Sequence, residues 1–296
     1  MKYRCAGIVT YNPDIKRLKK NIESIYSSLE TLIIVDNYSS NIVDIIDLIK
    51  DYSKITLIKN KENLGIATAL NEIVNLSIKL EYQWTLLLDQ DSICDSRIIS
   101  EYKEYLLYPN VGLLCPYIID INKINLNQYK KLSLPKYSKV KYAITSGTLI
   151  KNEIFSKVGG FWDELFIDAV DIDYSEKLRI NGFEQIRVNT TYLLQEVGHA
   201  EKTKILRIHR DHAGKFSIQP YYRTNHSLKR QYYMARNNVI LIKKYKKYNS
   251  VLLKSIFIVL YLSAKVLVEK NKKSLIKVIL KGVNDGIKFK TPIYSK

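Results

Sequence analysis

Short apolar runs alternate with amphipathic stretches along residues 3–89, and this alternation constrains the fold more than any other feature of the sequence. Between the runs, apolar residues recur at helical spacing, and Ile15, Leu18 and Ile22 form one such stripe. Strands that alternate with helices of about 10–15 residues predict a parallel sheet with right-handed crossovers. The expected strands are residues 3–11, 31–36, 54–60 and 84–89, and the expected helices are 14–28, 41–51 and a segment that starts near Gly65.

Beyond residue 95 the pattern becomes less regular. Residues 118–140 are polar and irregular, whereas the segments on either side regain the spacing of strands and helices. Gly182 follows a helical pattern and is expected to end that helix. Expected helices are 95–107, 151–161 and 171–181, and expected strands are 110–116, 142–150 and 184–189. The sequence therefore predicts an α/β fold with a mostly parallel central sheet and flanking helices.

Polar side chains follow the first four expected strands, and ligands of parallel sheets bind at these carboxyl ends. Asp36 ends the second strand, and Asp89 and Asp91 end the fourth. The first strand leads into "TYNPDIKRL", which contains no glycine. The glycine-rich fingerprint of dinucleotide-binding dehydrogenases and the P-loop are therefore both absent, and a phosphate site must use other groups.

Asp89 and Asp91 are the obvious candidates for such a site. In an extended segment the side chains of residues i and i+2 share a face, so both carboxylates can converge on one cation. Mg²⁺ and Mn²⁺ favour oxygen ligands, and Mg²⁺ commonly binds one or two carboxylates together with substrate phosphates. Aspartate is also common in turns that follow strands, so the pair alone does not decide the question. Asp36 at a neighbouring strand end favours the metal interpretation.

Three further carboxylates lie at or just before the start of an expected helix: Asp168, Asp171 and Asp173. Acidic residues favour the first helical turn through capping and the helix macrodipole, so one or two of them need have no other role. Three acids within six residues also suit general-base catalysis, in which a carboxylate accepts the proton of a sugar hydroxyl.

These segments together resemble the family 2 glycosyltransferases of GT-A fold, which bind nucleotide-diphosphosugars, and particularly the bacterial rhamnosyltransferase-like members. The resemblance extends over residues 3–245 and depends on the order of its pieces. The matching segments are "VTYNPDIKRLKKNIESI", "IIVDNYSS", "NKENLGIATALN", "LLLDQDS", "SGTLI", "VGGFWDELFIDAVDIDY" and "YYMARNNVIL".

The resemblance assigns expected roles to individual residues. Asp171 matches the catalytic base, although Val170 stands where many relatives have glutamate, a form typical of the rhamnosyltransferase-like branch. Asp89 and Asp91 match the DxD pair that holds Mg²⁺ or Mn²⁺ and the diphosphate. The nucleotide-binding residues implied are Thr10, Tyr11, Asp36, Asn63, Gly65, Asp89 and Arg236. Those implied near the acceptor or donor sugar are Ser146, Gly147, Trp162, Asp168, Asp173 and His226.

The roles that the resemblance implies for three residues compete with simpler ones. His199 follows an apolar run where some relatives place a third metal ligand, and His226 precedes a segment that relatives place near the diphosphate. A single histidine is also commonly a surface or hydrogen-bonded residue. Arg236 competes with the role of a solvated helix residue.

The reaction implied is an inverting displacement at the anomeric carbon of a nucleotide-linked sugar. The "FIDAVDIDY" form favours dTDP-rhamnose, while a UDP-hexose or UDP-galactofuranose stays open. The acceptor expected is a growing oligosaccharide of a cell-surface polysaccharide, often lipid-linked at the cytoplasmic leaflet.

Positive charge is concentrated in the last part of the chain. The net charge is +18, and residues 226–296 hold 17 Lys and Arg against Glu269 and Asp285, which leaves +3 for the rest. We therefore expect a catalytic domain over residues 1–225 and a basic helical region over 226–296. A nucleic-acid-binding role is the alternative, but no RNA- or DNA-binding signature accompanies the charge, and no nucleic acid is expected as a partner.

Residues 250–268 are rich in apolar side chains, but the charge-free window covers only Ser255–Ala264. A membrane-spanning helix needs about 20 apolar residues. We expect an interfacial helix that, with its lysines, binds an anionic membrane surface. The alternative is a helix that packs on the catalytic domain.

Cys5, Cys94 and Cys115 are widely spaced and odd in number, which predicts reduced thiols and neither a zinc site nor a disulfide scaffold. No signal peptide is expected at the start, because Asn12-Pro13 breaks a short apolar run. The protein is therefore expected in the cytoplasm, peripheral on the inner face of the plasma membrane. A nucleotidyltransferase would share the strand-end acids but would have a glycine- and basic-rich loop after its first strand.

Overall fold

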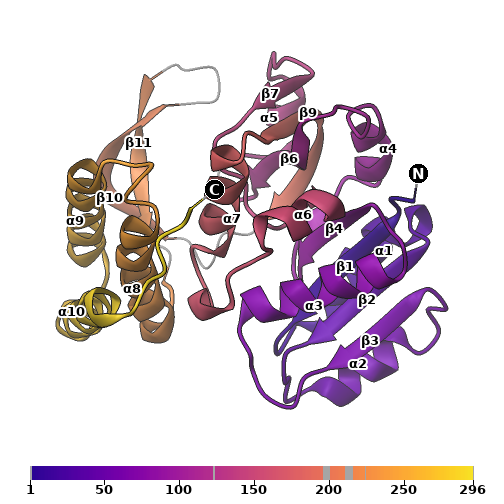
Figure 1. Ribbon diagram of the computed structural model, residues 1–296, viewed down its shortest axis with the longest axis horizontal. Helices are drawn as coiled ribbons and strands as arrows, with labels where there is room; N and C mark the ends of the chain where they lie inside the picture. The colour runs from indigo at the N-terminus through magenta and orange to yellow at the C-terminus, as the bar shows by residue number, and fades with distance from the viewer. Residues whose placement is uncertain (1, 123, 196–200, 211–215, 224, 296) are drawn as a thin grey trace. The chain divides into compact units, whose positions relative to one another are not determined.

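The computed structural model describes residues 2–122, 124–195, 201–210, 216–223 and 225–295 (Figure 1). The chain forms two compact units, which are described separately. The first comprises Met1–Phe166 and Val170–Glu196, and the second comprises Ile167–Ala169 and Val197–Lys296. This division falls about thirty residues before the domain boundary expected at 226, because the hairpin that precedes residue 226 packs with the C-terminal helices: the Arg223 Nε atom donates to the Val268 carbonyl.

The first half of unit 1 is the parallel sheet that the sequence predicts. Its strands lie in the order β3-β2-β1-β4 and are all parallel. Their bounds are β1 (Cys5–Thr10), β2 (Thr31–Asp36), β3 (Ile55–Lys59) and β4 (Trp84–Asp89). The connections are α1 (Ile15–Ile25) with the short η1 (Tyr26–Ser28), α2 (Ile42–Ile49) and α3 (Ile66–Lys79). The expected alternation of strands and helices is thus confirmed in this half.

The second half turns the sheet into a mixed one. β4 continues into β8 and β6 through antiparallel pairs, and β6 then pairs in parallel with β9. The strands are β5 (Ile93–Cys94), β6 (Val111–Asp120), β7 (Tyr137–Lys139), β8 (Thr148–Lys151) and β9 (Glu184–Gln195), with β5 and β7 antiparallel to β9. The helices are α4 (Ile98–Lys103), α5 (Leu126–Lys130), α6 (Asn152–Val158), η2 (Asp163–Leu165) and α7 (Val170–Ile180). The fold class is confirmed, with more antiparallel pairing than the sequence indicates.

The secondary structure differs most from that expected from the sequence over residues 111–151. The strand expected over 142–150 forms only at Thr148–Lys151, because Gly147 has φ of 77° and breaks the extended backbone. β6 extends through Pro116 into the segment expected to be irregular, and its register with β9 shifts between Pro116 and Tyr117. Proline cannot donate to a ladder, so a register shift is an expected accommodation.

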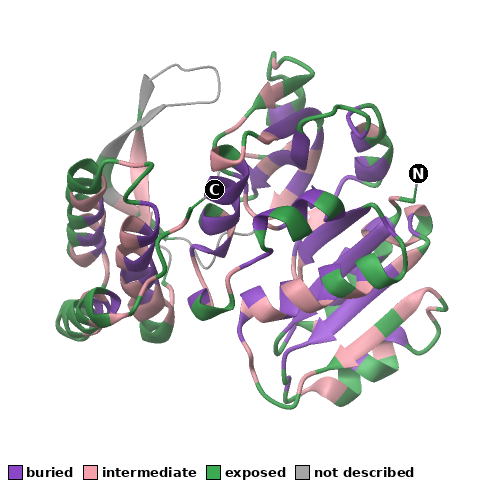
Figure 2. Ribbon diagram, in the orientation of Figure 1, coloured by how far each residue is buried: buried purple, intermediate pink, exposed green. Residues whose placement is uncertain are grey.

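The core of unit 1 lies between the sheet and its helices, and Figure 2 shows its central strands almost wholly buried. Helix α1 contributes Leu18, Ile22 and Ile25, all fully buried, and Asp14 caps it by accepting from the Arg17 backbone N–H. Gly7 of β1 permits close approach of α3: a Cβ there would lie 2.1 Å from the Ile73 side chain.

The described residues of unit 2 form a β-hairpin and three long helices. The hairpin pairs β10 (Glu201–Arg210) with β11 (Phe216–Arg223), and the helices are α8 (Leu228–Lys244), α9 (Val251–Val268) and α10 (Lys272–Lys288). Two glycines of α10 bring it against α8: a Cβ at Gly282 would lie 2.5 Å from the Tyr232 carbonyl oxygen, and one at Gly286 would lie 2.7 Å from that of Arg236. Among the described residues, α9 is long and apolar enough to cross a membrane by length and composition alone.

Candidate functional site

The carboxyl ends of β2, β1 and β4 lie side by side at one edge of the sheet of unit 1. The register aligns Thr10 with Asp36 and Val9 with Asp89. The Thr10 hydroxyl donates to one Asp36 carboxylate oxygen at 2.9 Å, and the Ser39 N–H donates to the other at 2.9 Å. Asp36 is only 2% exposed, so its carboxylate chiefly fixes the loop after β2. The nucleobase contact expected of Thr10 and Asp36 stays a prediction.

Asparagine side chains join the loops that follow these strands. The side-chain oxygen Oδ1 of Asn12 accepts from the N–H and the hydroxyl of Ser40. The Asn37 amide donates to Asn63 Oδ1 and to the Gly65 carbonyl, and its oxygen accepts from the Leu64 N–H. The sequence places Asn12 and Asn37 at strand ends, but the resemblance assigns roles only to Asn63 and Gly65. The signal was present, since asparagine after a strand commonly bonds to nearby backbone.

Two exposed tyrosines stand in these loops. Tyr11 is 48% exposed after β1, and Tyr38 is 61% exposed after β2 with φ of 74°. A non-glycine residue in the left-handed region carries strain, and such residues concentrate at functional sites. Exposed aromatic rings can stack on a nucleobase. Tyr38 was not among the residues expected from the sequence.

Three polar side chains hold the Asp89 end of β4. The Asp89 N–H donates to Ser146 Oγ at 3.0 Å, and the Asp89 carbonyl accepts from the fully buried Asn21 amide. The Gln195 amide lies 3.3 Å from Asp89 Oδ2. These bonds fix the peptide that carries the first carboxylate, and the sequence argument identified neither Asn21 nor Gln195.

Gln90, the middle residue of the DxD segment, secures it to β1. Its side-chain oxygen accepts from the Tyr11 N–H at 2.8 Å, and its amide donates to the Tyr11 carbonyl at 3.4 Å. Asp89 and Asp91 flank this anchor, and both stay partly exposed. The two carboxylates are thereby presented by a segment that is anchored at its centre through the Gln90 side chain.

The donor set at this edge fits a hard divalent cation completed by a ligand. The described residues contain no group of three or more His, Cys, Asp or Glu side chains that could hold a metal. Mg²⁺ sites, however, commonly use one or two carboxylates together with waters and substrate phosphates, which is what Asp89 and Asp91 offer. His199, the expected third ligand, lies outside the described residues.

Ser146 and Gly147 lie beside the end of β4, and their expected place near the acceptor or donor sugar stays a prediction. Ser146 is buried and donates to the buried Ser92 hydroxyl at 2.9 Å while accepting from Asp89. A Cβ at Gly147 would lie 2.8 Å from Pro116 Cγ, and the Gly147 carbonyl accepts from the Tyr102 hydroxyl. Ser146 therefore positions the Asp89 peptide, whereas the Gly147 N–H donates to the Leu87 carbonyl of β4 at 2.8 Å.

The acidic residues around α7 differ in how far they are buried. Asp171 lies in the first turn, is partly exposed, and its Oδ1 accepts from the Ile172 N–H at 2.9 Å. Asp173 is fully buried, 3.2 Å from Lys177 Nζ, and Lys177 also donates to the Gly160 carbonyl at 2.8 Å. Asp173 is therefore held in a buried ion pair, and its expected place near the acceptor or donor sugar stays a prediction. Asp171 keeps the geometry of a candidate base. Trp162 is partly buried before η2, and its expected role stays a prediction.

Strained backbone immediately precedes α7. Phe166, Asp168 and Ala169 have φ of 55°, 63° and 65°. The Phe166 carbonyl accepts from the Ile66 N–H at the start of α3, and a Cβ at Gly65 would lie 2.7 Å from that same carbonyl oxygen. Gly65 is thus required for close packing of the two segments. Its expected place beside the nucleoside stays a prediction.

The glycosyl transferase family 2 model matches residues 5–165, which include the strand ends and the DxD segment. The chain belongs to glycosyl transferase family 2. It is therefore a glycosyltransferase.

Further similarities extend beyond the matched segment. The dTDP-rhamnosyl transferase RfbF of Shigella flexneri is 28% identical over 300 residues, which cover 96% of this chain and 95% of that protein. Among solved structures, TarS 1-349 of S. aureus aligns with 98% of this chain and 73% of its own at a TM-score of 0.50 and 11% identity. GalNAc-T7 with UDP, GalNAc and Mn²⁺ aligns with 65% of this chain and 43% of its own at a TM-score of 0.52 and 13% identity. These structures support the GT-A fold.

The other site residues expected of this glycosyltransferase lie in unit 2. The Asp168 carboxylate accepts from Arg230 Nη2 at 3.0 Å and from its Nε at 3.1 Å, and the Asn237 amide donates to the Asp168 carbonyl. Arg236 lies 4.9 Å from the Phe289 ring centroid. Burial, with Arg230 and Lys265 nearby, lowers the pKa of His226 to about 4, so this imidazole is neutral at neutral pH. The sequence argument missed Arg230, and the ligand roles of Arg236 and His226 stay predictions.

The three cysteines of the glycosyltransferase are free and buried, as expected of reduced thiols. Burial raises the pKa of Cys5 to about 11 and that of Cys115 to about 12. Neither thiol is ionised near neutral pH, so neither has the thiolate character of a nucleophile or a metal ligand.

Replacing Ser146 tests whether it supports Asp89. In Ser146→Ala the Asp89 N–H loses its acceptor, and an unsatisfied buried donor costs about 1–3 kcal/mol. We expect a loss of that size in the free energy of unfolding, measured by urea denaturation. Ser100→Ala, which removes an exposed hydroxyl that donates to the Arg97 carbonyl in α4, is the control and should change it by less than about 0.5 kcal/mol. Equal effects of the two variants would contradict the supporting role.

Proposed function

We propose that this glycosyltransferase is a metal-dependent, inverting rhamnosyltransferase that uses dTDP-rhamnose. The observation that carries the choice of sugar is the similarity, over 96% of the chain, to a dTDP-rhamnosyl transferase. The acceptor we propose is a growing, lipid-linked oligosaccharide of a cell-surface polysaccharide, which would place the enzyme at the inner face of the plasma membrane.

The loops after β1, β2 and β3 supply the groups for the nucleoside in this proposal. Tyr11 and Tyr38 offer exposed rings against which a pyrimidine can stack. Asp36 and Asn37 hold those loops in place through the bonds described above. A rigid set of loops lowers the entropic cost of ordering the site around the donor.

Asp89 and Asp91 would hold the divalent cation and, through it, the donor diphosphate. A bound Mg²⁺ or Mn²⁺ supplies charge stabilisation for the departing nucleoside diphosphate. The contribution of the chain is to fix these two carboxylates in place. Ser146 accepts from the Asp89 N–H, and Asn21 donates to the Asp89 carbonyl. Gln90 anchors the segment by accepting from the Tyr11 N–H.

Asp171 is the proposed general base. Its carboxylate accepts the proton of the acceptor hydroxyl as that oxygen forms a bond to the anomeric carbon. The bond from this carbon to the diphosphate oxygen breaks on the opposite side, and its electron pair leaves with the nucleoside diphosphate. One displacement of this kind inverts the anomeric configuration.

A donor screen tests the choice of sugar. Purified protein with Mn²⁺ or Mg²⁺ is incubated with dTDP-rhamnose, UDP-GlcNAc, UDP-galactose or UDP-galactofuranose, and donor hydrolysis and binding are measured. We expect dTDP-rhamnose to give the tightest binding and the fastest turnover. Preference for a UDP-sugar would overturn the rhamnose assignment but keep the reaction class, an outcome that the UDP and UDP-GlcNAc complexes of TarS make worth including.

Asp171→Asn should lower kcat by about 10²–10⁴-fold, because the amide cannot accept the hydroxyl proton. The dissociation constant for dTDP-rhamnose, measured by calorimetry, should change little. Asp44→Asn is the matched control, since Asp44 is likewise an exposed acid in the first turn of a helix. Loss of donor binding in Asp171→Asn would count against its role as base.

Asp91→Ala should weaken the Mn²⁺-dependent binding of dTDP by at least about tenfold. Mutation of residues that only hydrogen-bond to metal ligands already lowers metal affinity by about that factor. Binding of dTDP without metal should be unaffected. Asp51→Ala, which removes an exposed carboxylate after α2, serves as control. Unchanged metal dependence in Asp91→Ala would remove the DxD pair from the proposal.

A further inference from the structure

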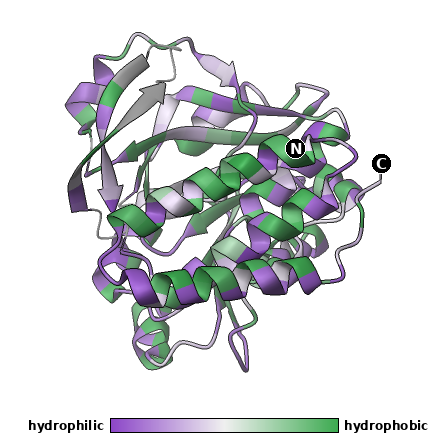
Figure 3. Cartoon of the chain, turned by 90° about the vertical axis from the view of Figure 1, so that its left-hand side faces the viewer, coloured by the Kyte–Doolittle hydropathy of each residue, from purple (hydrophilic) through white to green (hydrophobic). Residues whose placement is uncertain are grey.

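Helix α9 in unit 2 presents a large apolar face to solvent. The face is formed by eight side chains that are each between 46% and 70% exposed: Val251, Leu252, Leu253, Ile256, Phe257, Val259, Leu260 and Leu267. In Figure 3 helices α9 and α10 face the viewer, and apolar residues run along α9. Contiguous apolar surface of this extent on a soluble protein marks an interaction site.

The charged residues of α9 avoid this face. Lys265 interrupts the apolar run in sequence, yet it is only 5% exposed, and its Nζ lies 3.4 Å from the side-chain oxygen of the buried Gln231 on α8. Lys254 is half-buried, and the helix contains no acidic residue. The helix therefore turns a lysine inward and four of its five leucines outward, the reverse of the arrangement expected for a helix that faces water.

The inner face of α9 is packed within unit 2. Ile258 and Leu262 form a cluster with Met234 of α8 and with Leu275 and Ile279 of α10. A helix held along one side by protein, with a buried lysine on that side, is suited to lie in the plane of a membrane interface and not to cross the bilayer alone.

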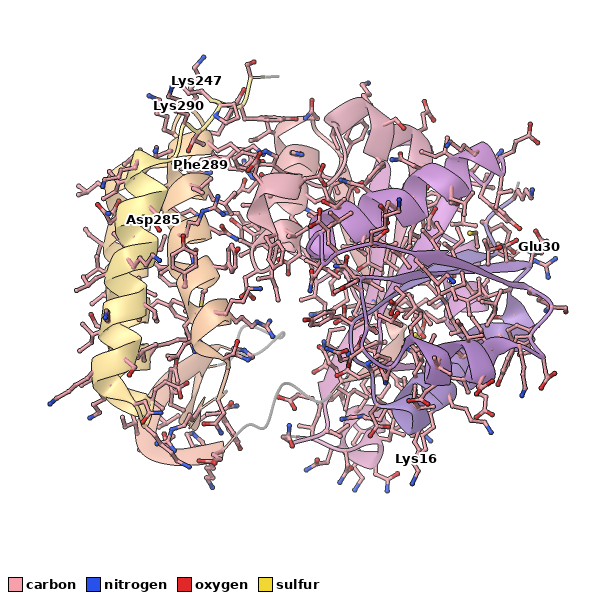
Figure 4. The ribbon with its side chains drawn as sticks, turned by 90° about the horizontal axis from the view of Figure 1, so that it is seen from below. Lys16, Glu30, Lys247, Asp285, Phe289 and Lys290 are labelled. Carbon is pink, nitrogen blue, oxygen red and sulfur yellow. The ribbon has the colours of Figure 1, made fainter. Side chains whose placement is uncertain are left out.

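Helix α10 adds positive charge next to this face. Most of its exposed residues are lysines interspersed with apolar side chains: Lys272, Lys273, Ile276, Lys277, Leu280, Lys281, Ile287 and Lys288. The single acid of α10, Asp285, accepts from the Tyr232 hydroxyl at 2.7 Å (Figure 4). Five lysines are thus exposed on α10 with one carboxylate, itself engaged, among them.

We propose that α9 and α10 form a docking surface for an anionic lipid membrane, with the apolar face of α9 inserted at the boundary of headgroups and acyl chains. The lysines of α10 bind the acidic headgroups, and this charge complementarity selects an anionic leaflet over a neutral one. The surface is independent of the sugar donor, so the proposal holds whichever nucleotide sugar the enzyme uses.

Vesicle sedimentation of the full chain without nucleotide sugar tests this docking. We expect binding to vesicles of phosphatidylcholine with about 30% phosphatidylglycerol, and weaker binding to phosphatidylcholine alone. Phe257→Glu/Leu260→Glu should weaken binding by roughly a hundredfold, because two large apolar side chains no longer insert. Val43→Glu/Leu107→Glu is the matched control, since it places the same charges at apolar positions of unit 1 that are 67% and 79% exposed.

A second set of variants separates charge from insertion. Lys272→Gln/Lys273→Gln/Lys277→Gln should weaken binding to the anionic vesicles on the order of a hundredfold. Raising the salt concentration from about 0.05 M to about 0.5 M should weaken vesicle binding of the unmodified protein by a similar factor. Lys79→Gln/Lys103→Gln/Lys131→Gln removes three exposed lysines from unit 1 and should leave binding unchanged. Circular dichroism of each variant establishes that its helices are intact.

Three outcomes would overturn the proposal. Equal sedimentation of the α9 variant and its control would show that the apolar face does not insert. A change in the mass of the protein in solution on Phe257→Glu/Leu260→Glu, without any vesicle binding by the parent, would assign the face to self-association. Resistance of the bound protein to extraction by alkaline carbonate would identify α9 as a spanning helix. Failure of the donor screen would leave all three measurements unaffected.

Discussion

The parallel pairing of β1 with β2 and β4 is the constraint on which the site depends. Because parallel strands end at the same edge of a sheet, three polar loops emerge side by side, and Thr10 lies opposite Asp36. The buried polar atoms of these loops must find partners there. They find them in each other, through Asn37 and Gln90, and the resulting network gives the edge a fixed shape.

Burial separates acids that look alike in the sequence. Asp173 is fully buried beside Lys177, and Asp36 is almost fully enclosed by a threonine and a serine. Asp89, Asp91 and Asp171 keep part of their surface. A buried carboxylate needs its partner to offset desolvation, whereas a partly exposed one is available for a cation or a proton. The same chemical group thus serves structure and chemistry within one unit.

Unit 2 differs from unit 1 in that a large part of its apolar side chains stays exposed. The close approach of α10 and α8 at Gly282 and Gly286 lets three helices bury a small apolar cluster. That cluster uses one side of α9 and leaves its more apolar side in contact with solvent. Exposure of so many large aliphatic side chains is unfavourable in water, which is why an apolar environment at this surface is the natural completion of the unit.

Features that depend on local periodicity or on a motif could be predicted from the sequence. They are the order of strands and helices in the first 90 residues, the acids at the strand ends, the family, and the concentration of basic residues after residue 226. The antiparallel course of β8 between β4 and β6 could not be predicted, because strand pairing at long sequence separation leaves no local signal. Side-chain partners are likewise decided by the fold: Ser146 holds the Asp89 peptide, and Lys265, which interrupts the apolar run in the sequence, turns inward to Gln231. Sequence determined which groups this protein has and their order along the chain, whereas tertiary structure decided which of them meet water, since burial is a property of the packed chain as a whole.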